Sequence, residues 1–235
     1  MIEIKNLKKV FGKETVLNDV NLSIGEGKVT AVVGPNGSGK TTLIKTILGL
    51  VKPTEGTIEV DGTKINGDFL YRKKIGYMPQ IARYPENLTT NELLSLITDL
   101  RESDKTFKDE ILVAFNLSDE MEKPFKSLSG GTKQKVSALI AFAYDPEILI
   151  LDEPTAGLDP ISSSYFKDLV LKEKNNKKTI ILTSHIMGEI QELADEIVFL
   201  LEGEVHFKGS VTSLLKDKNE TRLERAIALL MNQEK

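Results

Sequence analysis

A glycine-rich segment, residues 34–41, contains the residue types of a phosphate-binding loop. It reads Gly-Pro-Asn-Gly-Ser-Gly-Lys-Thr, so one glycine and four further residues precede Gly-Lys-Thr. Glycines allow a backbone to curl until several N–H groups point at one anion, and a helix that begins after the loop presents its positive end there. In this pattern Lys40 supplies a charge for the β- and γ-phosphates, and the Thr41 hydroxyl suits a Mg²⁺ ligand.

The context of this loop favours a nucleotide site over an ordinary glycine-rich turn. A short apolar run covers residues 29–33, and apolar residues at helical spacing follow the loop as far as Leu48. A strand before the loop and a helix after it are what the motif requires. The predicted contacts to a nucleotide in this segment are Gly34, Pro35, Asn36, Gly37, Ser38, Gly39, Lys40, Thr41 and Thr42.

Two adjacent carboxylates, Asp152 and Glu153, follow the apolar run 148–151. Ligands of open α/β sheets bind at the carboxyl ends of the strands. Asp152 is therefore predicted in the Mg²⁺ shell, directly or through water, and Glu153 is predicted to polarise the water that attacks the γ-phosphate. Taken alone, such a pair fits a solvated loop equally well, but beside a phosphate loop the catalytic interpretation is favoured.

Strand-like and helix-like patterns alternate around these motifs. Strands are predicted over residues 2–5, 16–24, 29–33, 56–60, 74–78, 148–151, 179–182 and 196–200. Thr89 and Glu92 have the spacing of a capping box, and further helices are predicted over 105–116 and 130–144. The predicted fold class is α/β, with a P-loop NTPase core built on a mostly parallel sheet, an N-terminal antiparallel β portion and an inserted α-helical lobe.

The predicted organisation is a single ATP-binding domain over residues 1–235. Segments 1–80 and 145–209 form its core, 81–144 form the helical lobe, and the tail 210–235 is helical and charged.

Composition excludes several classes of function. The 35 acidic and 31 basic residues argue weakly against general affinity for nucleic acid or anionic lipid. No uninterrupted apolar run approaches the ~18 residues that a spanning helix needs, and the first residues lack a signal-peptide pattern, so we expect a cytoplasmic protein. The absence of cysteine excludes disulfides, thiol catalysis and thiolate metal sites.

A third motif, Leu128-Ser129-Gly130-Gly131-Thr132, lies between the phosphate loop and the Asp-Glu pair. Its hydroxyl and glycines before a helical pattern suit a second anion site, although a plain helix cap is the alternative. Phosphate loop, Ser-Gly-Gly motif, Asp-Glu pair and a later histidine occur in the order seen in nucleotide-binding domains of ATP-binding-cassette (ABC) transporters. The chain resembles that family over nearly its whole length, and the Ser-Gly-Gly motif is the specific element.

The resemblance implies a mechanism that needs two copies of the chain. Two subunits of this family enclose two ATP molecules head to tail, so Ser129, Gly130 and Gly131 of one copy would contact the γ-phosphate bound by Lys40 of the other. Hydrolysis then opens the dimer and moves a membrane partner.

The resemblance also implies roles for other residues. Gln80 matches the glutamine loop that senses Mg²⁺ and the γ-phosphate, and His185 matches the switch histidine. Asp159 matches a loop that links the two sites of the dimer, and Phe11 lies where the family places an aromatic ring against adenine. Phe11 fits core packing equally well. The implied catalytic residues are Lys40, Gln80, Glu153 and His185, and the implied Mg²⁺ ligands are Thr41, Gln80 and Asp152.

Two positions depart from the family pattern. Thr132 stands where glutamine is usual, and Phe11 stands where tyrosine is more common. Neither change removes a catalytic group, so both are interpreted as marks of a subfamily. An inactive subunit would be expected to lack Glu153, His185 or the glycines, and this chain keeps them all.

Within the family, residues 153–160 and the modest C-terminal tail are similar to the multidrug and ABC-2-type exporters. Segments 75–89 and 128–136 are similar to a narrower group, the ATPase subunit of the transporter for copper-site maturation of nitrous-oxide reductase. Copper would not bind this chain, which has two histidines and no cysteine. An exporter of another cargo is the alternative.

The resemblance implies partners as well as chemistry. An integral membrane permease subunit is expected to bind the helical lobe near Gln80 and Tyr84, with Pro85, Leu93 and Ile97 as further candidates, and would hold the chain at the inner face of the membrane. Leu93 and Ile97 fit the core of the lobe equally well. A homodimer is expected in the ATP-bound state, a periplasmic partner of the permease in the copper-maturation group, and no nucleic acid.

Other classes of function remain as alternatives. A P-loop GTPase or nucleotide kinase would leave residues 128–132 unexplained. A regulatory ATP-binding module would use dimerisation rather than turnover as its output. A cassette protein acting on ribosomes or DNA usually has two cassettes or a long coiled-coil insertion, and the sequence shows neither.

Overall fold

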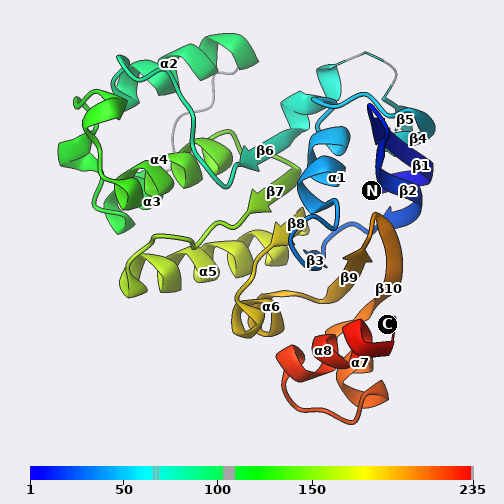
Figure 1. Ribbon diagram of the computed structural model, residues 1–235. Coiled ribbons are helices and arrows are strands. Elements are labelled where there is room, and N and C mark those ends of the chain that lie inside the picture. Colours follow the sequence, from blue (N-terminus) through cyan, green and yellow to red (C-terminus); the bar gives the residue numbers. More distant parts are fainter. Residues whose placement is uncertain (66, 68, 103–108, 234–235) are drawn as a thin grey trace. The chain divides into compact units, whose positions relative to one another are not determined.

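The computed structural model describes residues 1–65, 67, 69–102 and 109–233 (Figure 1). The chain divides into two compact units, one formed by Met1–Tyr71 with Thr179–Lys235 and the other by Arg72–Lys178. The positions of the units relative to each other are not determined. The second unit is wider than the predicted lobe 81–144, because it also includes strands and a helix on either side.

The first unit contains an antiparallel sheet of the order β2-β1-β4-β5. Its strands are β1 (Ile2–Phe11), β2 (Glu14–Ile24), β4 (Glu55–Val60) and β5 (Thr63–Lys64). Alternate residues of β1, such as Ile2 and Ile4, are buried, which fixes the register because a one-residue slip would expose them. This sheet is the predicted N-terminal antiparallel portion.

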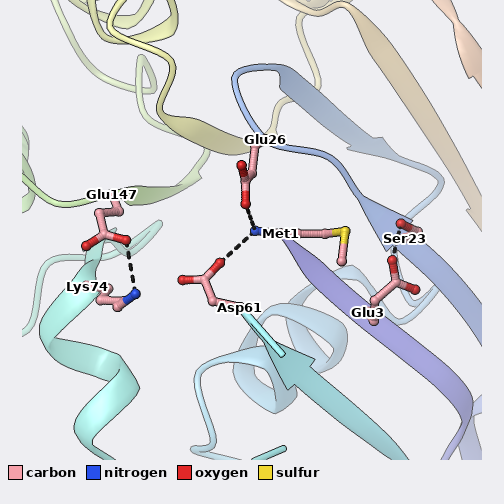
Figure 2. Close-up of polar contacts among 7 residues, drawn as sticks. All are labelled: Met1, Glu3, Ser23, Glu26, Asp61, Lys74 and Glu147. Carbon is pink, nitrogen blue, oxygen red and sulfur yellow. Dashed lines mark hydrogen bonds and ion pairs between the residues drawn. The ribbon is translucent and has the colours of Figure 1, made fainter. Parts of the chain in front are cut away.

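Polar contacts at the strand ends add little to this register (Figure 2). The amino group of Met1 lies 3.1 Å from the carboxylate of Glu26 and 2.8 Å from that of Asp61. The Ser23 hydroxyl donates to Glu3, its cross-strand partner on β1. Exposed ion pairs of this kind contribute about 0–1 kcal/mol each, so the buried apolar residues supply most of the stability.

The first unit also contains the neighbouring strands β10-β9-β3-β8. These are β3 (Val29–Val33), β8 (Thr179–Thr183), β9 (Glu196–Leu201) and β10 (Glu204–Ser210). β3 pairs in parallel with β8 and β9, and β10 adds an antiparallel edge. β3 and β8 are buried at every residue, as expected of strands covered on both faces.

The helices of this unit follow the strands. They are α1 (Lys40–Ile47), α6 (Met187–Leu193), α7 (Val211–Asp217) and α8 (Leu223–Gln233). The tail helices α7 and α8 close an apolar cluster with β3, α6 and β9, in which Leu214, Leu223 and Ala226 are fully buried. In Figure 1, α7 and α8 lie side by side at the red end of the chain.

The second unit combines a parallel strand pair with helices. Its elements are β6 (Ile75–Met78), α2 (Thr90–Arg101), α3 (Asp109–Ala114), η2 (Ser118–Glu120), η3 (Phe125–Ser127), α4 (Gly130–Phe142), β7 (Ile148–Asp152) and α5 (Pro160–Asn175), and the short helix η1 (Leu70–Lys74) leads into β6. Gly76 lets β6 approach α4, because a Cβ there would lie 2.1 Å from the carbonyl oxygen of Ala141. Lys74 and Glu147 pair at 3.1 Å just before the two strands (Figure 2).

The predicted capping box of α2 is confirmed. The N–H of Glu92 donates to the Thr89 hydroxyl at 3.2 Å, and the N–H of Thr89 donates to the Glu92 carboxylate at 2.7 Å. Residues 105–108 of the predicted helix 105–116 lie outside the described residues, and its described part gives α3. None of the described helices is both long enough and apolar enough to cross a membrane.

Candidate functional site

The phosphate loop connects β3 to α1 in the first unit. Gly34 packs against the end of β9, since a Cβ there would lie 2.0 Å from the carbonyl oxygen of Leu200. Gly39 precedes α1 with φ +102°, and a Cβ there would lie 2.8 Å from Leu17. Side chains at these positions would push the loop off the sheet. The first N–H groups of α1 have no acceptor within the helix, as at the start of any helix.

Two side chains of the loop suit an anion. The ammonium of Lys40 folds over the loop and donates to the carbonyl oxygens of Gly34 at 2.8 Å and Pro35 at 2.9 Å. Ser38 is 2% exposed, and its hydroxyl has no hydrogen-bond partner among the described residues. A buried hydroxyl without a partner is costly, and a phosphate oxygen would satisfy it. The loop therefore fits a nucleotide phosphate, with Asn36, Gly37 and Thr41 exposed and Thr42 partly buried.

His185 emerges at the same edge of the sheet as this loop. Ala31 of β3 pairs in parallel with Leu182 of β8, so Gly34 and His185 follow neighbouring strands at equal distance from the paired residues. His185 is an exposed residue. The Ser184 hydroxyl accepts the N–H of Ile186 at 3.0 Å, which shapes the turn between β8 and α6.

Phe11 ends β1 and is not a core residue. Its side chain is 48% exposed, and the ammonium of Lys9 lies 4.6 Å from its ring centroid. The core-packing alternative for Phe11 is therefore wrong, whereas stacking on adenine stays a prediction.

The carboxylates belong to the second unit. Met78 of β6 pairs in parallel with Leu151 of β7, so Gln80, Asp152 and Glu153 lie at one edge of this strand pair. Asp152 and Glu153 are buried, and Gln80 is exposed. Burial, together with the charge of Asp152, raises the pKa of the nearby Tyr77 phenol to about 12.

Glu153 has an unusual backbone conformation. Its φ is +51°, in the left-handed region that residues other than glycine rarely adopt. Such a conformation costs on the order of 1–3 kcal/mol and persists only where surrounding contacts hold it. It turns the chain sharply after β7.

The Ser-Gly-Gly motif forms the exposed N-terminus of the 13-residue helix α4. The Ser129 hydroxyl accepts the N–H of Thr132 at 3.1 Å and lies 2.7 Å from the Thr132 hydroxyl. Thr132, one of the departures from the family pattern, thus shares a hydrogen bond with the motif. Gly131 lies close to a neighbouring loop, because a Cβ there would lie 2.9 Å from the Gly157 carbonyl oxygen.

Asp159 caps α5 and pairs with α4. Its carboxylate accepts the N–H of Ser162 at 2.9 Å and lies 2.9 Å from the ammonium of Lys135. Lys135 and then the Ser162 groups hold the pKa of Asp159 well below its usual value. The sequence predicts a role for Asp159 across a dimer, and the structure adds these contacts within its own chain.

Sequence reasoning did not find Gln134 or Lys135. Gln134 is 6% exposed on α4, and its amide nitrogen lies 3.3 Å from the Glu153 carbonyl oxygen and 3.2 Å from that of Pro154. The sequence offers no clear signal for Gln134, because two lysines flank it and Ser137 shares its helix face.

Of the residues predicted to bind a permease, Leu93 does not lie on the surface. Leu93 is 1% exposed, so it belongs to the core and cannot line a groove; for Leu93 the core alternative holds. The Tyr84 ring is half-buried and packs edge-on against Phe125 at 5.3 Å. Pro85 is exposed and Ile97 partly buried.

The site residues thus form two groups. The first unit brings together the phosphate loop and His185, and the second brings together Gln80, Asp152, Glu153 and the α4 N-terminus. Among the described residues, no three His, Asp or Glu side chains gather as a metal cage. Thr41, Gln80 and Asp152 stay the predicted ligands of a Mg²⁺ ion that would be bound together with the nucleotide phosphates.

Comparison with known proteins agrees with this geometry. The family model described as "ABC transporter" matches residues 17–156. The chain belongs to the ABC transporter family. The cassette is 37% identical over 205 residues to the lantibiotic transport ATP-binding protein SrtF of Streptococcus pyogenes, covering 87% of this chain and 89% of SrtF. It is therefore the ATPase subunit of an ABC transporter.

Solved structures show the same fold. The cassette superposes on an ATP-binding subunit of an ABC transporter with a TM-score of 0.92 and 29% identity, covering 98% of this chain and 99% of the other. It also superposes, with a TM-score of 0.81 and 28% identity, on a dimeric post-hydrolysis cassette bound to ADP and Pi. That match covers 90% of this chain and 99% of the other. Cassettes of this type hydrolyse ATP, dimerise and pair with membrane permeases.

Proposed function

We propose that this cassette hydrolyses MgATP in a head-to-tail homodimer whose closure and opening drive an export permease. The observation that carries the proposal is the exposed N-terminus of α4, where Ser129 and Gly130 face solvent in the unit that also holds Asp152 and Glu153. A hydroxyl and helix N–H groups so placed are available to a phosphate held by a second copy. The dimeric relative bound to ADP and Pi supports this arrangement.

Each group has a defined task in the proposed reaction. The ammonium of Lys40 and the loop N–H groups bind the β- and γ-phosphates, and Ser129 of the partner copy caps the γ-phosphate from the other side. Glu153 orients the attacking water and accepts its proton, while His185 donates to the γ-phosphate. Mg²⁺, when bound with ATP, would neutralise charge that develops on the phosphates. Phe11 stacks on the adenine ring, and Asp159 connects the two sites.

The permease and the cargo follow from weaker observations. We propose that a permease subunit contacts the cassette beside Gln80, Tyr84 and Pro85 and holds it at the cytoplasmic face of the membrane. SrtF is named for lantibiotic transport, which favours an exporter of amphipathic peptides or similar compounds. The narrower assignment to copper-site maturation of nitrous-oxide reductase, with its periplasmic partner, gains no support from these relatives and stays a prediction.

The proposal is tested by steady-state MgATP hydrolysis of wild type, Glu153→Gln and Ser129→Arg. Both variants should lose at least about 100-fold in kcat, since one lacks the general base and the other blocks the phosphate contact. Glu147→Gln, at the opposite end of β7, and Ser127→Arg, an exposed serine before α4, are the matched controls and should keep near wild-type rates.

Sizing chromatography gives the second measurement. Glu153→Gln should become dimeric with ATP and stay monomeric without it, because the trapped nucleotides hold the two copies together. Survival of hydrolysis in Ser129→Arg would contradict the dimeric site, and survival in Glu153→Gln would contradict the assigned base.

A further inference from the structure

The turn after β7 holds Glu153 in an unfavourable backbone conformation. Glu153 is in the left-handed region at φ +51°, and the residue after it is Pro154, which has no N–H to donate. Within the turn, the N–H of Ala156 donates to the Glu153 carbonyl oxygen at 3.2 Å. The N–H of Leu158 likewise donates to the Thr155 carbonyl oxygen at 3.0 Å. An unfavourable backbone conformation persists only where the surrounding structure over-determines it, so further contacts that support this turn matter.

Gln134 supplies that support from α4. Its buried amide nitrogen donates to the carbonyl oxygens of both Glu153 and Pro154, at 3.3 Å and 3.2 Å. Because both partners are acceptors, only the NH₂ end of the amide can satisfy them, so the orientation of the side chain is determined by the contacts. A buried amide with both donors directed at consecutive carbonyls restricts the rotation of the peptide unit that carries Glu153.

The same part of α4 touches the rest of this turn. Gly131 lies against the carbonyl oxygen of Gly157, and Lys135 pairs with Asp159 at 2.9 Å. The first turns of α4 therefore contact the segment 153–159 at its start, middle and end, and all of these residues belong to one unit.

We propose that Gln134 is a positioning residue for Glu153, and that α4 connects Ser129 to the hydrolytic turn of the same chain. This inference rests on the proposed function, which assigns Glu153 as the base and Ser129 as the contact to the partner's nucleotide. In that dimer, α4 of each copy contacts one site through Ser129 and its own Glu153 through Gln134. When Ser129 contacts the nucleotide bound by the partner copy, this contact is thereby transmitted to Glu153, the base of the chain's own site.

The decisive variant is Gln134→Met, which keeps the length of the side chain and removes both donors. We expect kcat to fall about 10- to 100-fold through misplacement of the base, while KM and the affinity for ATP stay within about twofold. The matched control is Lys133→Met on the adjacent position of α4, whose ammonium lies 5.4 Å from the Phe125 ring and which should keep the wild-type kcat. An unchanged kcat in folded Gln134→Met would overturn the proposal.

A second experiment, in the Glu153→Gln variant, separates a role of Gln134 in positioning Glu153 from a general effect on the fold. In Glu153→Gln, addition of Gln134→Met should cause no further loss of the residual rate, because the base through which Gln134 acts is already absent. The double variant should still dimerise with ATP. A further drop in rate, or loss of the dimer, would show that Gln134 acts on the Ser129 motif or on the fold instead, and would sink the inference.

A readout that does not depend on turnover keeps this test distinct from that of the proposed function. Hydrogen exchange of the Ala156 amide should become at least about tenfold faster in Gln134→Met than in wild type, while Lys133→Met leaves it unchanged. If wild type does not hydrolyse ATP, the proposed function fails, and Ala156 exchange alone decides whether Gln134 holds the turn. If Gln134→Met does not fold, Gln134→Asn, which retracts the amide by one methylene, replaces it with the same expected outcomes.

Discussion

Gly34 and Gly37 belong to the same phosphate loop but meet different surroundings. A Cβ at Gly34 would lie 2.0 Å from the carbonyl oxygen of Leu200, a backbone atom that cannot move aside alone. A Cβ at Gly37 would have no neighbour within 4 Å, although its φ of +82° disfavours any side chain. The two glycines are therefore required for different reasons: close packing at Gly34 and backbone conformation at Gly37.

This difference predicts unequal costs for alanine. Gly34→Ala should lower the free energy of unfolding by at least about 3 kcal/mol, because the loop must move off the sheet. Gly37→Ala should cost about 1–2 kcal/mol, the strain of a left-handed residue. Urea denaturation measures the free energy of unfolding of both variants. Nucleotide binding should be weakened more by Gly34→Ala than by Gly37→Ala. Equal losses of stability would contradict the packing argument.

Helix α5 is anchored at its C-terminal end by an ion pair that water hardly reaches. The ammonium of Lys178 lies 2.6 Å from the Glu173 carboxylate, with side chains that are 10% and 0% exposed. Lys178 also pairs with Asp145, in the turn after α4. One lysine thus connects the ends of two helices of the second unit, and loss of its charge would remove the cation that faces the buried Glu173 carboxylate.

We expect Lys178→Met to lower the free energy of unfolding by about 3–5 kcal/mol, as for other broken buried pairs. Lys177→Met, on the exposed neighbouring residue, is the matched control and should change stability by less than about 0.5 kcal/mol. Replacing Glu173 and Lys178 together by methionine should recover much of the loss, since no buried charge then remains. Chemical denaturation of the variants measures these free energies of unfolding. Equal effects of Lys178→Met and Lys177→Met would refute a stabilising buried pair between Glu173 and Lys178.

At the scale of the whole molecule, the proposed site is completed by a second copy of the chain. Ser129 and Lys40 lie on different units of one chain, and the proposed dimer brings Ser129 of one copy to Lys40 of the other. This arrangement predicts complementation between defective copies, which no single-chain site could show.

The test mixes Lys40→Met with Ser129→Arg, each inactive alone. Half of the dimers formed at random contain one copy of each, and one of their two sites joins an intact Lys40 to an intact Ser129. At most about a quarter of the wild-type rate should therefore return, and less if α4 couples the two sites. Mixing Lys40→Met with Lys40→Met/Ser129→Arg is the control and should restore nothing. A mixture no more active than its components would exclude the head-to-tail arrangement.

Local patterns in the sequence determined the family, the fold class and the order of the elements. Strands such as 29–33 and 148–151 were predictable because buried parallel strands are continuous apolar runs. The Thr89 capping box was predictable because both partners lie within one helical turn. The phosphate loop was predictable because its chemistry requires glycines at fixed spacing within one segment.

The predicted strands do not include the edge strand β10, although its residues alternate in exposure, because Glu202 and Gly203 before it are only a weak signal for a hairpin turn. Only the tertiary structure decided that Leu93 lies in the core and that Phe11 does not, because a periodic pattern identifies a face without saying what covers it.

The contacts of Gln134 with the Glu153 turn and of Lys135 with Asp159 also came only from the tertiary structure. These residues are far apart along the chain, and nothing local in α4 indicates which loop it approaches. Packing of α4 against the end of β7 brings these residues together. The sequence therefore determines the motifs, whereas only the fold determines which side chains hold them in place.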